Sequence, residues 1–190
     1  AYFSNCLNTN ANTFTANAGV FGKVYFPRLV TPISNVISTV IRFGIQMLLV
    51  VGFLLYYLVQ GEVAPHWAAW LVIPIELLHM GVLGMGCGII ISSLTTKYRD
   101  LTVLVGFGVQ LWMYLTPVVY PLSTVAEGWK RTALCLNPVT SSAELMRYAI
   151  LGQGTLNWGY YGLSWLLTVL VAVVGIMIFN KVERTFMDTV

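Results

Sequence analysis

The chain has 190 residues, of which 57% are hydrophobic and 9% charged, whereas soluble globular domains carry about 25% charged residues. So few charges exclude an ordinary water-soluble domain, which needs far more polar surface to cover its core. The net charge of +3 comes without a basic run or an RNA-binding motif, so the sequence predicts no nucleic-acid partner.

Four apolar stretches meet or approach the length of about 20 residues that a helix needs to cross a bilayer. Lipid cannot hydrogen-bond an open backbone, which favours helices, and a β-barrel would show alternating segments of about 10 residues instead. The sequence therefore predicts an all-α, polytopic membrane helix bundle with four transmembrane helices and re-entrant outer helices. We treat residues 1–190 as one transmembrane domain with spans at 34–60, 67–94, 101–120 and 156–180.

Residues 1–33 combine a polar, Asn-rich stretch with the segment Gly-Lys-Val-Tyr-Phe-Pro-Arg-Leu, in which Pro27 and Pro32 bracket a short element. The element carries aromatic side chains and two cations, Lys23 and Arg28. It suits docking on a soluble protein, and it equally suits a basic anchor at the membrane surface.

The second span contains glycines four residues apart, Gly84 and Gly88, preceded by Gly81. Such spacing lets a second helix approach closely. We favour packing within the chain over a dimer seam.

The same span carries Glu76 and His79, one helical turn apart on one face. Ionisable groups inside a membrane are costly, so we expect a partner or a wet cavity beside them. A proton or metal site is one interpretation, and a hydrogen-bonded pair facing the bundle or a pathway is the other. Di-iron bundle proteins need a second Glu-x-x-His motif, which the chain lacks, so no metal centre is predicted.

The segment 121–155 is half apolar, but it contains Pro121 and Pro138, and Pro117 lies just before it. Irregular backbone at membrane depth must be covered by protein or lie beside water. We expect two short helices that dip into the outer leaflet and return, split near Asn137.

Positive charges indicate the orientation of the spans, because cytoplasmic loops are enriched in Lys and Arg. Seven of these residues lie on one predicted side and three on the other, in 121–155. The bias places both ends of the chain and the 95–100 loop in the cytoplasm. The seven are Lys23, Arg28, Arg42, Lys97, Arg99, Lys181 and Arg184.

No catalytic motif is present: the chain has no GxxxxGK[ST] phosphate loop, no HExxH and no GxSxG. Its three cysteines are scattered, which argues against a disulfide framework or a zinc site. We therefore expect no enzyme and no cofactor bound by this chain, and any ATP would be hydrolysed by another chain.

Several ordered segments together resemble the permease subunits of type-2 ABC exporters for polysaccharides and polyol phosphates, such as O-antigen, capsule and teichoic acid. They cover essentially the whole chain. The segments are LNTNANTFTANAGVFGKVYFPRLVTPIS, KYRDL, LTPVVYPLS, LNPVTSSAELMRYAILG and VERTFMDTV.

The resemblance implies a subunit of six spans, of which this chain would lack the first part, beginning near the cytoplasmic end of the second span. It also implies a multi-pass protein of the cytoplasmic (inner) membrane, a second permease copy forming a homodimer, and two ATPase subunits holding ATP-Mg. The contacts with the ATPase would match Lys23, Tyr25, Phe26, Pro27 and Arg28 in the first coupling region, and Lys97, Arg99 and Asp100 in the second.

The substrate implied by the resemblance is a lipid-linked polysaccharide such as O-antigen or capsule. Sugars have apolar faces, so aromatic walls suit them, and we single out Trp112, Tyr114, Tyr120 and Trp129 as candidates along the pathway. Ordinary packing and interface anchoring are the competing roles for these rings. The alternative function is a type-2 ABC permease for a drug, lipid or other small substrate.

Overall fold

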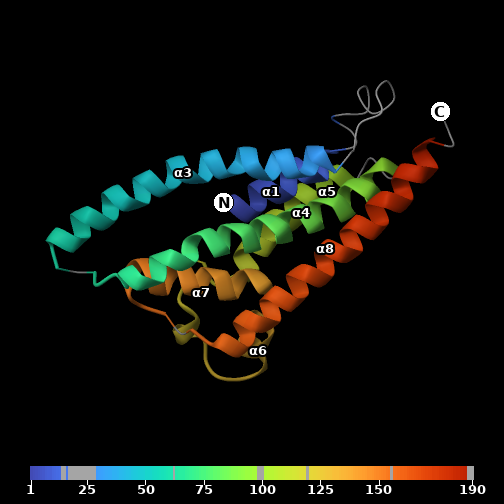
Figure 1. The fold of residues 1–190 in the computed structure, drawn as a ribbon. Coiled ribbons are helices and arrows are strands. Elements are labelled where there is room, and N and C mark those ends of the chain that lie inside the picture. Colours follow the sequence, from blue (N-terminus) through green and yellow to red (C-terminus); the bar gives the residue numbers. More distant parts are fainter. Residues whose placement is uncertain are drawn as a thin grey trace. The chain divides into compact units, whose positions relative to one another are not determined.

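The computed structural model describes residues 1–13, 16, 29–61, 63–97, 101–118, 120–154 and 156–187; for residues 96, 97, 102 and 183–187 it describes the backbone alone. In these ranges the chain is helical and has no strand (Figure 1). The elements are α1 (Tyr2–Ala11), α3 (Val30–Val59), η1 (Trp67–Val72), α4 (Ile73–Lys97), α5 (Leu101–Leu115), η2 (Leu122–Thr124), α6 (Trp129–Leu136), α7 (Pro138–Leu151) and α8 (Trp158–Met187).

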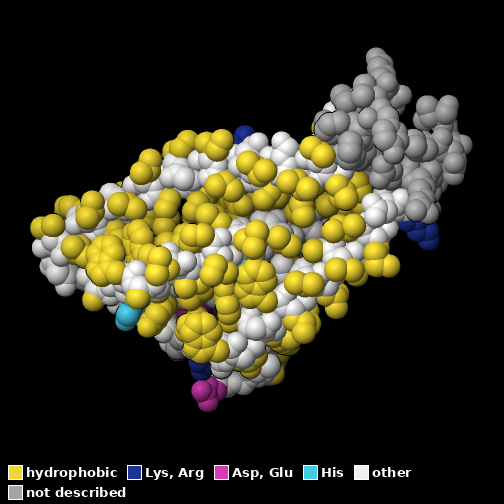
Figure 2. Space-filling view, in the orientation of Figure 1, with side chains coloured by type: hydrophobic (Ala, Val, Ile, Leu, Met, Phe, Trp, Pro, Cys, Tyr) yellow, Lys and Arg dark blue, Asp and Glu magenta, His cyan; other side chains and the backbone are white. Residues whose placement is uncertain are grey.

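In the part of the chain that the structure describes, three helical segments are long and apolar enough to cross a membrane: Val30–Val59, Trp67–Thr95 and Trp158–Val182. The fourth apolar helix, α5, has 15 residues and so a length of about 22 Å, short of the roughly 30 Å of hydrocarbon in a bilayer. Hydrophobic side chains cover most of the face shown in Figure 2, and charged side chains are few. The predicted all-α membrane bundle is confirmed.

Prolines explain where the helices depart from the predicted span limits. Helix α3 begins at Val30, before the predicted residue 34, because Pro32 is tolerated in a first turn, where its missing N–H has no helical partner. Pro74 likewise lies in the first turn of α4, after the 3₁₀ turn η1. Helix α5 ends at Leu115, before the predicted residue 120, because Pro117 disfavours helix at Thr116.

The chain forms two compact units, which we describe one at a time. Unit 1 comprises Ala1–Arg42, Gly81–Val109 and Thr168–Val190; unit 2 comprises Phe43–Met80 and Gln110–Leu167.

In unit 1, α1 packs against the glycine stripe of α4 (Figure 1). A Cβ added to Gly84 would lie 2.7 Å from Cys6 Cβ, and one added to Gly88 would lie 2.5 Å from Asn10 Cβ and 2.8 Å from the Leu7 carbonyl oxygen. Only glycine permits this approach of two backbones. The intrachain packing that the Gly84–Gly88 spacing favours is thus present.

Helices α4 and α8 also approach closely within unit 1. A Cβ on Gly175 would lie 2.9 Å from the carbonyl oxygen of Gly86. Beyond this crossing, Ile89 of α4 and Phe179 of α8 are fully buried and form the centre of a small apolar core. Small residues therefore set the spacing of the helices that meet in unit 1.

Candidate functional site

The outer segment of unit 2 carries the candidate site. The predicted division of 121–155 is present: α6 ends at Leu136 and α7 begins at Pro138. Asn137 separates them, and its Oδ1 accepts hydrogen bonds from Val139 N and Trp112 Nε1, both at 3.1 Å. Its Nδ2 donates to Thr116 Oγ1 at 3.0 Å. One amide thus caps α7 and attaches it to the end of α5.

A buried ion pair fixes the proline-rich connector to α7. Arg147 pairs with Glu144, and its Nη2 donates to the Val118 carbonyl oxygen at 2.9 Å. Glu144 Oε1 also accepts from Leu122 N at 3.1 Å. Glu144 is only 2% exposed, so these partners compensate for a carboxylate that has lost its water. The sequence showed these two residues merely as opposite charges three positions apart.

A second polar group, which we call the His79 cluster, comprises Glu76, His79, Ser142, Tyr161 and Ser164. His79 is fully buried, with Nδ1 3.0 Å from Ser142 Oγ and Nε2 3.1 Å from Ser164 Oγ. Tyr161 donates to Glu76 Oε1 at 2.6 Å, and the carboxylate lies 3.5 Å from His79 Nδ1. The cluster therefore joins the first part of α4 to α7 and to the start of α8.

The His79 cluster has the geometry of the hydrogen-bonded pair considered for Glu76 and His79, extended by three hydroxyl groups. Trp165 stacks on the imidazole with ring centroids 4.5 Å apart. Among the described residues no group of three or more His, Cys, Asp or Glu side chains could hold a metal ion. The cluster can hold helices together and can relay a proton between hydroxyl, imidazole and carboxylate; the role of Glu76 and His79 stays a prediction.

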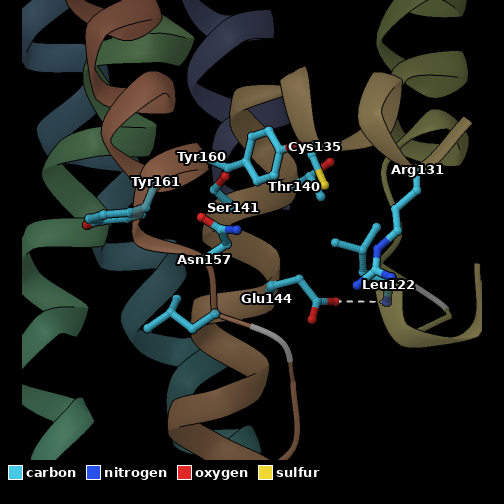
Figure 3. Close-up of a pocket in the computed structure, with 10 residues that line it drawn as sticks. Leu122, Arg131, Cys135, Thr140, Ser141, Glu144, Asn157, Tyr160 and Tyr161 are labelled. Atoms are coloured by element: carbon cyan, nitrogen blue, oxygen red, sulfur yellow. Dashed lines mark hydrogen bonds between the residues drawn. The ribbon is translucent and has the colours of Figure 1, made fainter. Parts of the chain in front are cut away.

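A cavity of about 190 Å³ lies between α6, α7 and the start of α8 (Figure 3). Arg131 of α6 and Glu144 of α7 approach one end of it, near Leu122, and Tyr160 of α8 lies over Ser141. Its wall is formed by Leu122, Arg131, Cys135, Thr140, Ser141, Glu144, Leu156, Asn157, Tyr160 and Tyr161. It combines hydroxyls, an amide, charges and aromatic faces in one small space.

The four aromatic residues predicted to line the substrate pathway lie outside the cavity wall. Trp112 serves Asn137 as a hydrogen-bond donor, and Tyr114 and Trp129 are 70% and 77% exposed. Tyr120 is 37% exposed. None of the four lines the cavity, and their assignment to a substrate pathway stays a prediction.

The predicted ATPase-coupling residues lie outside the described residues, except Lys97, of which only the backbone is described. The residues outside are Lys23, Tyr25, Phe26, Pro27, Arg28, Arg99 and Asp100.

The cavity residues were missed because the sequence offered weak signals for them. Tyr160 and Tyr161 look like a membrane-interface belt, and Ser141 is one of many small polar residues. The one available signal is the run Thr140, Ser141, Ser142 at the start of an otherwise apolar helix, where buried hydroxyls need partners.

The helices and their buried polar groups define a multi-pass helical membrane protein. The family model of the ABC-2 type transporter matches residues 2–151. The chain belongs to the ABC-2 type transporter family, and so to an ABC transporter system that works with partner subunits.

Proteins similar to this chain are named as permeases of O-antigen export systems. Two proteins of Klebsiella pneumoniae, each called O-antigen export system permease protein RfbA, are 29% and 28% identical over 187 residues, which is 98% of this chain and 70% of theirs. A protein of Myxococcus xanthus with that name is 29% identical over 143 residues, 74% of this chain and 52% of its own length.

Proposed function

We propose that this chain is the transmembrane subunit of an ATP-driven ABC exporter that moves an O-antigen-type polysaccharide across the cytoplasmic membrane. The observation that carries the proposal is the similarity over 98% of the chain to permeases named for O-antigen export. The similarity includes the outer segment, where a transported glycan would leave. A lipid carrier on the glycan is part of the proposal and comes from the family resemblance.

The geometry of unit 2 supports a polar substrate. Apolar side chains suffice to pack helices in lipid, yet the outer segment buries Glu144, Ser141, Ser142 and Thr140. Ionisable groups inside a membrane often mark substrate pathways, and Glu144 is such a group. Hydroxyls and amides are the groups that hydrogen-bond sugars.

The assembly we propose contains a second copy of this subunit and two ATPase subunits. ATP-Mg is bound and hydrolysed on the ATPases, so this chain is not an enzyme and binds no cofactor. The family assignment supports an ABC system, and the absence of a phosphate-loop motif from the sequence supports nucleotide binding elsewhere. Both ends of the chain face the cytoplasm, as the Lys and Arg bias supports.

The alternative, a permease for a drug-sized substrate, gains no support from the cavity. Drug-sized ligands occupy pockets of about 300–1,000 Å³. The cavity measures about 190 Å³, which is below that range.

A gene deletion in the organism that carries the chain tests the proposal. Without the complete subunit, polysaccharide should disappear from the surface of intact cells and accumulate inside, as detected by a glycan-specific antibody before and after lysis. Reintroducing the subunit with its ATPase should restore surface polysaccharide, and an ATPase with an inactivated nucleotide site should not. Unchanged surface polysaccharide in the deletion strain would contradict the proposal.

A further inference from the structure

The cavity between α6, α7 and α8 has the size of a single six-membered ring with its substituents. An engineered protein cavity of about 150 Å³ binds benzene, a six-membered ring without substituents. The cavity here is about 190 Å³, which leaves room for a ring that carries a few small groups.

The wall chemistry distinguishes this cavity from an apolar void that would bind benzene. Glu144 and Arg131 bring a carboxylate and a guanidinium to one end, and Asn157 and Ser141 add an amide and a hydroxyl (Figure 3). Tyr160 adds an aromatic face. Polar groups at the edge of a ring and an aromatic face beside it match a pyranose, which has hydroxyls around its rim and C–H groups on its faces.

The wall also contains a polar atom without a partner. Thr140 is 1% exposed, and its Oγ1 has no hydrogen-bond partner among the described residues. Buried hydroxyls are nearly always hydrogen-bonded, so the Thr140 hydroxyl is available to hydrogen-bond a polar guest in the cavity.

The charges of the wall are already compensated, which argues against an anion as the guest. Glu144 is paired with Arg147, and Arg131 Nη1 lies 3.2 Å from Glu127 Oε1. An anionic guest would meet the buried Glu144 carboxylate, whereas a neutral hydroxyl can donate to it.

We propose that this cavity is a subsite for one neutral pyranose residue. The proposal deepens the proposed function, on which it rests for the identity of the transported molecule. The subsite lies within the outer segment, between α6, α7 and the start of α8.

Cys135 lines the cavity and reports on its occupancy. Cys6 and Cys87 are replaced by Ala in the complete subunit, which is purified with its ATPase in nanodiscs. The rate at which methyl methanethiosulfonate modifies Cys135 is then measured with increasing methyl α-D-glucopyranoside, methyl α-D-mannopyranoside or methyl α-D-galactopyranoside. At least one of the three glycosides should slow the modification of Cys135 at least fivefold, with a saturable dependence on concentration. Glycerol at the same concentration should not slow it.

Two variants test the assignment to the wall. Thr140→Val keeps the side-chain volume and removes the hydroxyl, and Tyr160→Leu removes the aromatic face; each should weaken protection at least fivefold. Thr132→Val is the matched control, because Thr132 is exposed on α6 and lies outside the wall. In this variant the glycoside should protect Cys135 as well as it does in the parent protein. If both wall variants keep full protection, the site is wrongly assigned.

Failure of this inference can be told apart from failure of the proposed function. If the intact assembly exports polysaccharide but no glycoside protects Cys135, the subsite is overturned and the export function stands. If a glycoside protects Cys135 but deletion leaves surface polysaccharide unchanged, the export function fails. Competition by the purified cell-surface polysaccharide would identify a residue of the exported chain as the guest, and competition by a glycolipid in the nanodisc would identify a lipid headgroup.

Discussion

At the scale of single residues, the side chain of His79 is held by contacts with α7 and α8. Both ring nitrogens have a serine hydroxyl within hydrogen-bond distance, and Trp165 covers one face. Hydrogen bonds between membrane helices contribute about 0.6 kcal/mol each on average. The imidazole therefore stabilises the contact of three helices through its packing as well as through these two hydrogen bonds.

We predict that His79→Ala lowers the free energy of unfolding by about 2–3 kcal/mol, since it leaves a cavity and removes the hydrogen bonds to Ser142 and Ser164. His66→Ala is the control, because His66 is exposed and only stacks on Tyr148 with centroids 4.3 Å apart. That change should cost less than about 1 kcal/mol. Thermal unfolding of the subunit in detergent would measure both, and equal losses would contradict the special position of His79.

The sequence predicts that Glu76 needs a partner, and it offers His79, which lies one helical turn further along the chain. It could not predict Ser142, Tyr161 and Ser164, which lie 63 to 85 positions further along the chain than their partners. Serines are too common in this sequence to stand out. Only the packing of α7 and α8 on α4 selects these three.

At the scale of elements, Asn137 divides the outer segment. We predict that Asn137→Ala costs about 2 kcal/mol, because it removes a helix cap worth about 1 kcal/mol and two bonds to α5. Asn157→Ala, which removes only the bond accepted from Gly159 N, should cost about 1 kcal/mol or less. Thermal unfolding of the two variants side by side checks the difference.

The glycine stripe of α4 gives a second prediction for an element. Gly88→Ala forces a Cβ to 2.5 Å from Asn10 Cβ, so α1 must shift, at a cost of about 1–3 kcal/mol. Gly106→Ala on α5 meets nothing within 4 Å and should be neutral or stabilising by up to about 1 kcal/mol. A Gly88→Ala variant as stable as Gly106→Ala would mean that α1 does not pack on the stripe.

The division of the outer segment at Asn137 was predictable from Pro138. Proline lacks an N–H, which suits the first turn of a helix, and it disfavours helical conformation in the residue before it. The shortness of α5 was less visible, since the apolar run continues to Tyr120 and only Pro117 marks the end. The attachment of the connector to α7 through Arg147 could not be predicted, because it consists of bonds to backbone oxygens, which carry no sequence signal.

The outer segment also gives an accessibility prediction. Cysteine at position 127 or 130 should react with an impermeant thiol reagent added from outside, because Glu127 and Lys130 are exposed. Cysteine at 145 should react far less, since Leu145 is 3% exposed. Native Cys6, Cys87 and Cys135 are replaced by Ala, so that labelling reports the introduced cysteine alone. Labelling of 127 and 130 only from the cytoplasm would refute the re-entrant arrangement.

At the scale of the whole molecule, the order of the predicted spans gives a topology that can be tested. Reporter fusions after Gly61 and near Gly128 should read outside, and one at Lys97 should read inside, because the Lys and Arg bias sets the orientation. An inside signal at Gly128 would contradict the span order.

Transmission of motion from the ATPases is a second prediction at this scale. In the full-length subunit, reversing the charges of Lys23 and Arg28 should uncouple ATP hydrolysis from export, at a stability cost within about 0.5 kcal/mol. Export and ATPase binding are measured on the same preparation. If both are unchanged, these residues are not the coupling element.

The packing of α1 on α4 has a consequence for biogenesis. Asn10 of α1 is fully buried, and 78 residues separate it from Gly88 (88 minus 10). At about 5–20 residues per second, a ribosome needs about 4–16 s to make that length. Among the described residues, α3 is made before the glycine stripe and already contacts α1, because Asn35 Nδ2 donates a hydrogen bond to Asn10 Oδ1 at 3.3 Å. We therefore expect α1 to associate with α3 first and to pack on the glycine stripe of α4 afterwards.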